Sequence, residues 1–266
     1  MNIYEFHQGT LPLLISIPHA GTFVPESIAQ RFTLAGSRLA DTDWHVDKLY
    51  EFARELGACV LKANYSRYVV DLNRSPDSAA LYEGSPTSPV CPLLTFDEEP
   101  IYLPGREVTA TEVQARVDQY WRPYHERLVA ELKAMRERHG YALLWDAHSI
   151  ASQVPSLFVG VLPEFNFGTR DDASCPRAVA DQLLDLVTSD GKFGAVLNGR
   201  FKGGYITLQY GRPKERVYAV QLELSRRVYM DEAAGTGWNP EHAQPAAALI
   251  SQLLKRYLEA GVPPGP

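Results

Sequence analysis

Two kinds of hydrophobic pattern alternate along the chain. The first is a short, nearly continuous apolar run between polar or turn-forming residues, which predicts a buried strand. Runs of this kind occupy residues 13–17, 58–61, 68–72, 141–145, 156–161 and 217–224. The second is a longer stretch with apolar residues at every third or fourth position, which is typical of a helix. Stretches of this kind occupy residues 41–56, 109–138, 175–187 and 239 to about 258.

The two longest predicted helices carry capping signals at their ends. Thr109 and Glu112 fit a capping box, and Gly140 lies just beyond the far end of the same helix. Asn239 and Pro240 supply an N-cap and a first-turn proline for the last helix. Because strands alternate with helices, the sequence predicts an α/β fold, with a mixed, mostly parallel sheet that helices flank.

The chain is long enough to bury one substantial core. It has 266 residues, of which 45% are hydrophobic, so we predict a single domain over residues 1–266. Residues 75–105 are rich in Pro, Gly and Ser and predict a long irregular excursion, which in a compact domain is usually functional or mobile. We expect the short tail at about residues 261–266 to be frayed.

Net charge and cysteine usage narrow the classes of partner. The formal net charge is -6, which argues against a nucleic-acid-binding surface, although a local arginine pocket can still bind an acidic small molecule. No apolar stretch approaches the roughly 18 residues that span a membrane, and the first ten residues do not resemble a signal peptide. The three cysteines are widely spaced and suggest no disulfide framework. We therefore expect a reduced, cytoplasmic protein that binds neither nucleic acid nor membrane. The sequence does not indicate whether the protein is a monomer or an oligomer.

Two histidines follow predicted strands. His19 comes directly after the first strand, in a turn bounded by Pro18 and Gly21. Asp146 and His148 follow the strand at 141–145, and their spacing of two points both side chains to the same side of an extended backbone. Either histidine alone could be a surface-loop residue. Together they favour a site in the crevice beyond the carboxyl ends of the strands.

The segment after Ala40 is rich in possible metal ligands. It carries Asp41, Asp43, His45 and Asp47 at the start of a predicted helix. An acid there can simply complement the helix dipole, which explains one carboxylate but not three together with a histidine. Two histidines and a carboxylate with an open fourth position make a catalytic zinc site. The chain has no GxSxG elbow and no HExxH helix, so other hydrolytic chemistries find little support.

Glu223 interrupts an otherwise apolar strand end. A buried carboxylate is costly without a partner or a purpose. It could form an ion pair with Arg226 or Arg227, or it could act as a general base beside a zinc ion.

Further candidates for substrate binding follow the predicted strand at 68–72. Arg74 offers a planar fork that matches a carboxylate, and Asn73 adds a donor; alternatively, Arg74 is structural and pairs with Asp71. The segment at 202–205 is either a glycine-hinged loop whose backbone or Tyr205 reaches the substrate, or a plain turn.

The order of these motifs is specific even though each motif alone is weak. Together they resemble the N-formylglutamate amidohydrolase family, over about residues 13–227. The resemblance is carried by Ser16-Ile17-Pro18-His19-Ala20-Gly21, Asp43, Ser66-Arg67, Asp71-Leu72-Asn73-Arg74, Asp146-Ala147-His148-Ser149, Lys202-Gly203-Gly204-Tyr205 and Glu223-Leu224-Ser225-Arg226.

The resemblance implies a fold like that of the zinc carboxypeptidases and N-acetylmuramoyl amidases, also called the phosphorylase/hydrolase-like fold. It implies one Zn²⁺ held by His19, Asp43 and His148, with Glu223 as the base. The family pattern has a small residue two places after the Asp, where this chain has His45, so Asp41, His45 and Asp47 remain rival ligands.

The resemblance also implies that Asn73 and Arg74 match the Asn-Arg pair that grips a substrate carboxylate. We expect Gly204, Tyr205 and Arg226 to be further substrate-binding residues. The implied reaction is hydrolysis of N-formyl-L-glutamate to formate and L-glutamate, in histidine degradation. The alternatives are a zinc amidase or carboxypeptidase for another acyl amino acid or peptide fragment, and a non-catalytic protein that binds an acyl amino acid.

Overall fold

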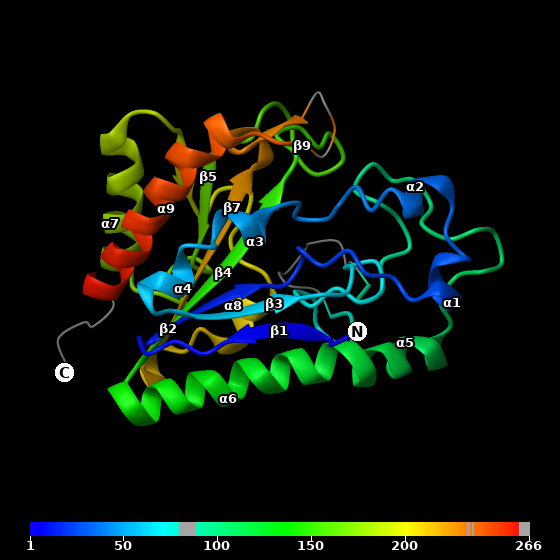
Figure 1. Ribbon diagram of the computed structural model, residues 1–266, viewed down its shortest axis with the longest axis horizontal. Coiled ribbons are helices and arrows are strands. Elements are labelled where there is room, and N and C mark those ends of the chain that lie inside the picture. Colours follow the sequence, from blue (N-terminus) through cyan, green and yellow to red (C-terminus); the bar gives the residue numbers. More distant parts are fainter. Residues whose placement is uncertain (80–88, 233–234, 236, 261–266) are drawn as a thin grey trace.

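A seven-stranded mixed sheet organises the computed structural model (Figure 1), which describes residues 1–79, 89–232, 235 and 237–260. The strand order is β1-β3-β2-β4-β7-β5-β6. The strands are β1 (Tyr4–His7), β2 (Leu13–Ile17), β3 (Cys59–Ala63), β4 (Ala142–Ile150), β5 (Phe165–Gly168), β6 (Ala195–Leu197) and β7 (Val217–Ser225). Of the six strand pairs described within this sheet, four are parallel, and the pairs β1 with β3 and β5 with β7 are antiparallel. The predicted mixed, mostly parallel α/β sheet is confirmed.

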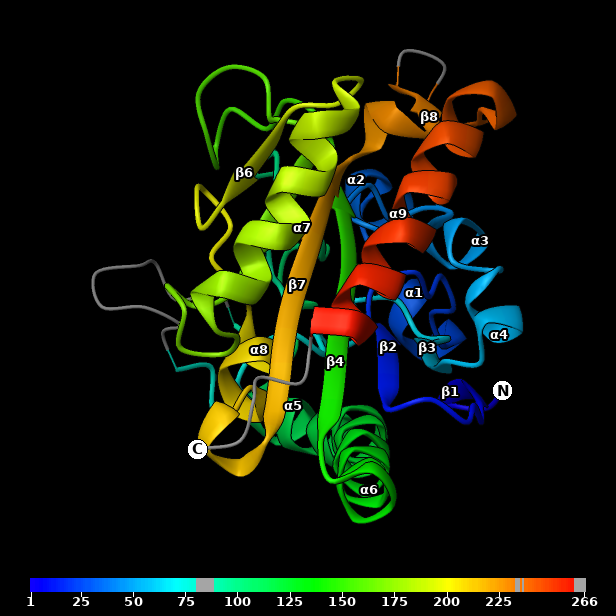
Figure 2. The same ribbon diagram turned by 90° about the vertical axis from the view of Figure 1, so that its left-hand side faces the viewer.

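Helices cover both faces of the sheet. Figure 1 shows α7 and α9 on one side and α6 on the other, and Figure 2 shows α7 and α9 lying across the strands. The first face is covered by α3 (Val46–Leu49), α4 (Ala53–Leu56), α7 (Arg177–Asp190) and α9 (Pro240–Ala260). The second face is covered by α5 (Ala110–Arg116), the π-helical turn η1 (Val117–Trp121), α6 (Arg122–His139) and α8 (Tyr205–Tyr210). The smaller elements are α1 (Glu26–Ala29), α2 (Leu34–Ser37), η2 (Pro213–Glu215), η3 (Arg226–Val228), β8 (Met230–Asp231) and β9 (Gly237–Trp238).

The central strands are buried on both faces, as their continuous apolar runs predict. All five residues of β2 are buried, and its apolar side chains alternate between the two cores. Leu13 and Ile15 pack in the core under α7 and α9, whereas Leu14 packs in the core under α6. Two cores separated by one sheet leave the carboxyl ends of the parallel strands as the place where polar side chains can gather.

Two of the predicted strands are wrong. Residues 68–72 form turns outside the sheet, and their apolar side chains pack in the α6-side core instead. Residues 156–161 form a surface loop in which Val159 is fully exposed, and the strand in this region is β5. The apolar run at 68–72 correctly indicated buried side chains, and the run at 156–161 did so only in part. Neither run specified that its residues pair with a strand.

The predicted helix at 41–56 is also wrong in its first part. Only α3 and α4 are helical there, because residues 41–45 form a turn in which His45 adopts a left-handed φ of 62°. Gly57 ends α4 with a left-handed φ of 92°, as a C-terminal glycine should.

The other helix ends agree with the sequence. The Thr109 hydroxyl accepts a hydrogen bond from the Glu112 amide (3.3 Å), and Gly140 follows α6 with a φ of 80°. The Asn239 side chain accepts bonds from the amides of Glu241 (3.1 Å) and His242 (3.2 Å). The long predicted helix at 109–138 is one rod of α5, η1 and α6, with the π-helical turn just before Pro123. The predicted tail at 261–266, and residues 80–88 of the predicted excursion, lie outside the described residues.

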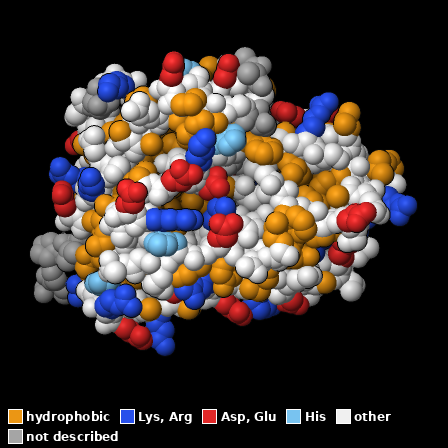
Figure 3. All heavy atoms as spheres, viewed as in Figure 1, with side chains coloured by type: hydrophobic (Ala, Val, Ile, Leu, Met, Phe, Trp, Pro, Cys, Tyr) orange, Lys and Arg blue, Asp and Glu red, His pale blue; other side chains and the backbone are white. Residues whose placement is uncertain are grey.

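Apolar side chains gather at the right of Figure 3, where Figure 1 places α1 and α2. Leu34 of α2 is 73% exposed, and Phe23 and Leu103 are exposed beside α1.

Cys59, Cys91 and Cys175 are all buried, and none of them forms a disulfide. Among the described residues, no helix has the length and apolar content to cross a membrane.

Candidate active site

Three adjacent parallel strands bring the predicted site residues to one edge of the sheet. His19 lies just beyond β2, Asp146 and His148 lie in the last part of β4, and Glu223 lies near the end of β7. The register of β4 and β7 places His148 directly opposite Glu223. Residues that are far apart in the sequence therefore meet because the strands that carry them are neighbours.

His19, Asp43 and His148 form a group that could hold a metal ion. Their ligand atoms all lie within 4.8 Å of one another, and the three residues are only 3%, 1% and 3% exposed. The Oδ2 atom of Asp43 lies 3.1 Å from Nδ1 of His148 and 3.7 Å from Nδ1 of His19. Two histidine nitrogens and a carboxylate oxygen are the donor set of a catalytic zinc site with an open fourth position.

A second carboxylate orients each of these histidines. Nε2 of His19 lies 2.8 Å from Oδ1 of Asp71, and Nε2 of His148 lies 2.9 Å from Oδ2 of Asp146. Because an ionised carboxylate only accepts, each Nε2 carries a proton, and each Nδ1 faces Asp43, where a metal ion would take the place of any proton on Nδ1. Carboxylates that hold the second nitrogen of metal-binding histidines are a regular feature of zinc sites.

Charge in this buried group also fits a cation. Four carboxylates, those of Asp43, Asp71, Asp146 and Glu223, lie around the histidines. Arg67 is buried among them, and its Nη2 atom lies 2.6 Å from Oδ2 of Asp71. A single guanidinium does not balance four carboxylates, so a divalent cation would offset much of the remaining negative charge.

The pKa shifts of the two histidines differ in sign because their surroundings differ. Burial lowers the pKa of His19, with a further contribution from the Arg67 charge. Burial also acts against the charged form of His148, but Asp146 and Asp43 outweigh it and hold its pKa well above the usual value. Burial opposes ionisation of Asp43 too, yet its bond to His148 and the His19 charge lower its pKa.

The rival ligands near Asp43 are engaged elsewhere. Asp41 accepts a hydrogen bond from the Phe96 amide through Oδ2 (2.9 Å). Asp47 pairs with Lys62 (3.3 Å) and is 40% exposed. The left-handed turn at His45 places its ring 5.8 Å from that of Trp238. Asp43 is thus the member of this segment that joins the two histidines.

Glu223 is buried next to this group without an arginine partner among the described residues. Its Oε2 atom accepts a hydrogen bond from Nε2 of Gln221 (3.3 Å). Burial raises its pKa to about 8, while the nearby His148 acts to lower it. A cation at the neighbouring group would favour the carboxylate form further.

The two arginines after β7 bind elsewhere, so the ion pair considered for Glu223 does not form with them. Arg226 donates to the backbone carbonyls of Ala40 (3.0 Å) and Thr42 (2.6 Å), just ahead of Asp43. Arg227 pairs with Glu164. Substrate binding by Arg226 stays a prediction, and two of its donors already hold the segment that precedes Asp43.

The predicted substrate-binding residues lie beside the group. Nδ2 of Asn73 donates to Oδ2 of Asp146 (3.1 Å), and its Oδ1 accepts from the Ile206 amide (2.8 Å). The Gly204 amide donates to Oε1 of Gln221 (2.7 Å), and an added Cβ at Gly204 would lie 2.4 Å from the Asn73 side chain. Only glycine therefore fits there. These contacts bring Asn73 and Gly204 into the site, and their binding of substrate stays a prediction, as it does for Arg74 and Tyr205.

Sequence reasoning gave no role in the site to Arg67 or Gln221, and it considered Asp71 only as a partner for Arg74. In the structure Asp71 pairs with Arg67, four residues before it, and with His19, 52 residues before it. Gln221 precedes Glu223 by two, which in a strand puts both side chains on the same side. A second polar residue in a buried strand was the available signal for Gln221.

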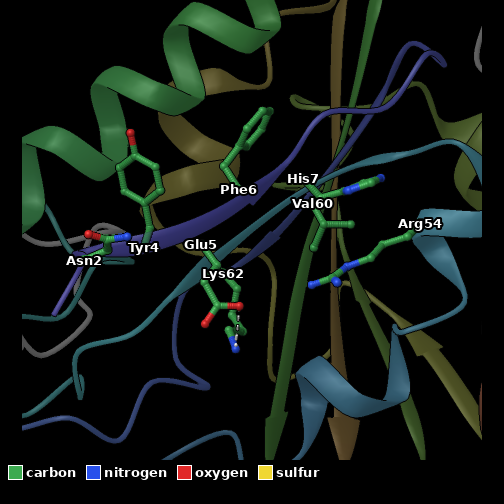
Figure 4. A pocket seen from close by; sticks show the side chains of 8 residues that line it. All are labelled: Asn2, Tyr4, Glu5, Phe6, His7, Arg54, Val60 and Lys62. Atoms are coloured by element: carbon green, nitrogen blue, oxygen red, sulfur yellow. Dashed lines mark ion pairs between the residues drawn. The ribbon is translucent and has the colours of Figure 1, made fainter.

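A separate hollow of about 350 Å³ lies at the edge strand β1 and contains none of the site residues. Figure 4 shows its lining side chains, with the ion pair of Glu5 and Lys62 across it. The lining residues are Asn2, Tyr4, Glu5, Phe6, His7, Arg54, Val60 and Lys62. They include no metal-binding group, so the candidate active site is the one at the ends of β2, β4 and β7.

Known proteins share both the sequence and the fold. The chain is 46% identical over 259 residues to the N-formylglutamate deformylase of Pseudomonas putida and 45% identical to that of Pseudomonas aeruginosa, with 97% of each chain covered in both cases. The crystal structure of N-formylglutamate amidohydrolase from Ralstonia eutropha JMP134 superposes with a TM-score of 0.81 at 28% identity, covering 98% of this chain and 100% of that one. The Agrobacterium tumefaciens gene product Atu2144 shares the fold with a TM-score of 0.70 at 19% identity, covering 96% of both chains. Residues 11–230 match the family described as N-formylglutamate amidohydrolase, and this chain belongs to that family.

Proposed function

We propose that this chain is a zinc-dependent amidohydrolase that hydrolyses N-formyl-L-glutamate to formate and L-glutamate. The observation that carries the proposal is a buried His19, Asp43 and His148 group with the Glu223 carboxylate beside it. The names of its relatives, which are N-formylglutamate deformylases at 45–46% identity, support the choice of substrate. We place the reaction in histidine degradation and the protein in the cytoplasm, as one catalytic domain.

His19, Asp43 and His148 would hold the zinc ion. Nδ1 of each histidine faces the carboxylate of Asp43, and Asp71 and Asp146 fix the opposite ring nitrogens. When bound, zinc supplies a Lewis acid that polarises the acyl carbonyl and lowers the pKa of water toward about 7.

Glu223 acts as the general base and then as the general acid. Its carboxylate takes the proton of the attacking water as the carbonyl carbon becomes tetrahedral, and returns that proton to the departing amine nitrogen. Gln221 holds one carboxylate oxygen through Nε2, which leaves the other oxygen for the water. The opposed register of His148 and Glu223 keeps base and metal ligand on neighbouring strands.

Arginines supply the positive charge that the substrate requires. Arg74 binds a carboxylate of the amino acid, with Asn73, Gly204, Tyr205 and Arg226 forming the rest of the substrate pocket. Holding the substrate by its carboxylate positions the formyl amide for attack, an effect that can be worth several kcal/mol. We assign to Arg67, which is buried beside Asp71, the stabilisation of the negative charge that develops on the carbonyl oxygen.

The test is metal content by elemental analysis together with formate release from N-formyl-L-glutamate, with and without a chelator. We expect about one zinc per chain and formate release that the chelator stops and added zinc restores. Zinc without formate release would contradict the proposed substrate, and a screen of other acyl amino acids and peptide fragments would then follow. A protein that binds neither zinc nor another divalent metal after reconstitution would contradict the hydrolase itself and favour a binding protein.

A further inference from the structure

Three consecutive carbonyl groups of the proposed substrate-binding segment each accept a hydrogen bond from another element of the fold. The Leu72 carbonyl lies 2.9 Å from Nε2 of His125, and the Arg74 carbonyl accepts a bond from the indole Nε1 of Trp121 (3.0 Å). Between them, the Asn73 carbonyl accepts from the Tyr205 amide (3.3 Å) at the start of α8, and also from Nη1 of Arg74 (3.1 Å). The backbone that carries Asn73 and Arg74 is therefore held along its whole length, although it belongs to no helix or strand.

Trp121 and His125 hold each other as well as the segment. Their rings stack with centroids 3.6 Å apart and an interplanar angle of 20°. Because a carbonyl only accepts, Nε2 of His125 carries the proton, and Nδ1 accepts from the Tyr210 hydroxyl (2.7 Å). Both side chains are at least 93% buried, so neither can exchange its carbonyl partner for water.

A rare backbone feature accompanies the pair. Trp121 is the last residue of the π-helical turn η1, and His125 lies one turn further along in α6. Pro123 lacks an amide hydrogen, so the helix cannot form its regular bond at that position. Single π-helical turns inside α-helices are found disproportionately at functional sites. Here the π-helical turn lies where the side chains of Trp121 and His125 bind the backbone of residues 72–74.

We propose that Trp121 and His125 are positioning residues that set the affinity for the substrate carboxylate by fixing the backbone of residues 72–74. The inference rests on the proposed function, in which Arg74 binds that carboxylate. Neither aromatic residue contacts the metal-binding group in this account. Their loss should therefore weaken binding of the substrate and leave the chemical step and the zinc ion in place.

The variants separate the hydrogen bonds from the packing. Trp121→Phe keeps a ring on His125 but removes the indole N–H. His125→Leu removes the donor to Leu72, whereas His125→Gln can still donate from its terminal amide. Tyr50→Phe is the matched control, because it removes the hydroxyl that accepts from Nε1 of Trp145 (2.8 Å) in the core on the other face of the sheet.

The measurements are kcat and KM for N-formyl-L-glutamate, the inhibition constant of L-glutamate as product, zinc content and the thermal midpoint of unfolding. For Trp121→Phe and His125→Leu we expect KM and the inhibition constant to rise about three- to tenfold, the typical worth of one hydrogen bond. The value of kcat should stay within about twofold and zinc should be retained. His125→Gln should recover most of the lost affinity, and Tyr50→Phe should lower the thermal midpoint without changing KM.

Unchanged KM and inhibition constants in Trp121→Phe and His125→Leu, with only a lower thermal midpoint, would overturn the inference. A fall in kcat or zinc content at constant KM would overturn it too, because the pair would then support the metal-binding group. Failure of the zinc-loaded wild-type protein to release formate would contradict the proposed function itself, and it is recognised before any variant is compared.

Discussion

Glu223→Gln is the substitution that tests the proposed chemistry most directly. The amide has nearly the same shape as the carboxylate but cannot accept the proton of the attacking water. The backbone at this position is held independently, because Nδ2 of Asn166 donates to the Glu223 carbonyl (3.1 Å) and β7 pairs on both sides. We therefore expect the variant to fold normally and to keep zinc, since Glu223 is not among the three clustered ligands.

The size of the loss follows from the role. A positioned general base contributes about 10²- to 10⁴-fold to rate, which is about 2.7 to 5.4 kcal/mol at 1.36 kcal/mol per tenfold change. The loss should fall on kcat, because the side chain keeps its volume and one acceptor oxygen. KM should change by less than about threefold, since the proposed substrate-binding residues are untouched.

The assay is steady-state formate release together with zinc analysis of the same preparation. Glu131→Gln is the matched control: Glu131 is also a buried carboxylate, but it lies on α6 beside Arg127 (2.7 Å), away from the metal-binding group. Its kcat should equal that of the wild-type protein. If Glu223→Gln loses zinc along with activity, Glu223 is a ligand rather than the base. If its kcat falls less than tenfold, another group takes the proton.

The remaining predictions concern ligands, substrate and stability. Arg74→Ala should raise KM for N-formyl-L-glutamate about 10- to 100-fold, as expected for a hydrogen bond to a charged group. KM for a formamide without a carboxylate should rise much less. An equal rise in KM for both substrates would show that Arg74 does not bind the carboxylate. Asp43→Ala should abolish zinc binding whereas His45→Ala should leave it intact, as elemental analysis can show, and the reverse result would exchange their roles. Asp71→Asn should weaken zinc binding about 10- to 100-fold in a chelator competition, and an unchanged affinity would contradict its orienting role. Burial lowers the pKa of His125 to about 3. Between about pH 6.5 and 3 the unfolded chain therefore binds one more proton at this residue than the folded chain does. The free energy of unfolding should fall as pH drops through this window, by about 2 kcal/mol at pH 5. In denaturant titrations His125→Gln should remove this part of the pH dependence, and an unaltered dependence would contradict the assignment.

The central part of the fold was predictable because its strands are buried on both faces. The runs at β2, β4 and β7 are continuous, and a helix follows most of them at a short distance. The edge strand β1 was not predicted. It pairs with β3 alone and its residues are at most partly buried, so its sequence lacks a continuous apolar run. Residues 68–72 show the opposite limit: an apolar run records burial, but strand pairing depends on neighbours that lie elsewhere in the sequence.

The residues themselves did not separate Asp43 from its three rival ligands, and only the family resemblance favoured it. The choice of Asp43 depends on a left-handed turn at His45 and on the bonds of Arg226 to the carbonyls of Ala40 and Thr42. The last of these contacts spans 184 residues. Local propensity predicted a regular helix here, and the regular helix would have turned these side chains away from a common point. Long-range contacts overrode the local preference.

Polar residues in buried strands carried most of the information about the site. Asp146, Gln221 and Glu223 lie in β4 and β7, where every residue is buried. A carboxylate in such a strand loses its hydration, so it persists only if a partner or a function compensates for that loss. Glu223 has no ion-pair partner among the described residues, and Asp146 has His148, which itself faces Asp43. In this chain, the ionisable residues that break the hydrophobic pattern of β4 and β7 are therefore the residues on which the proposed chemistry depends.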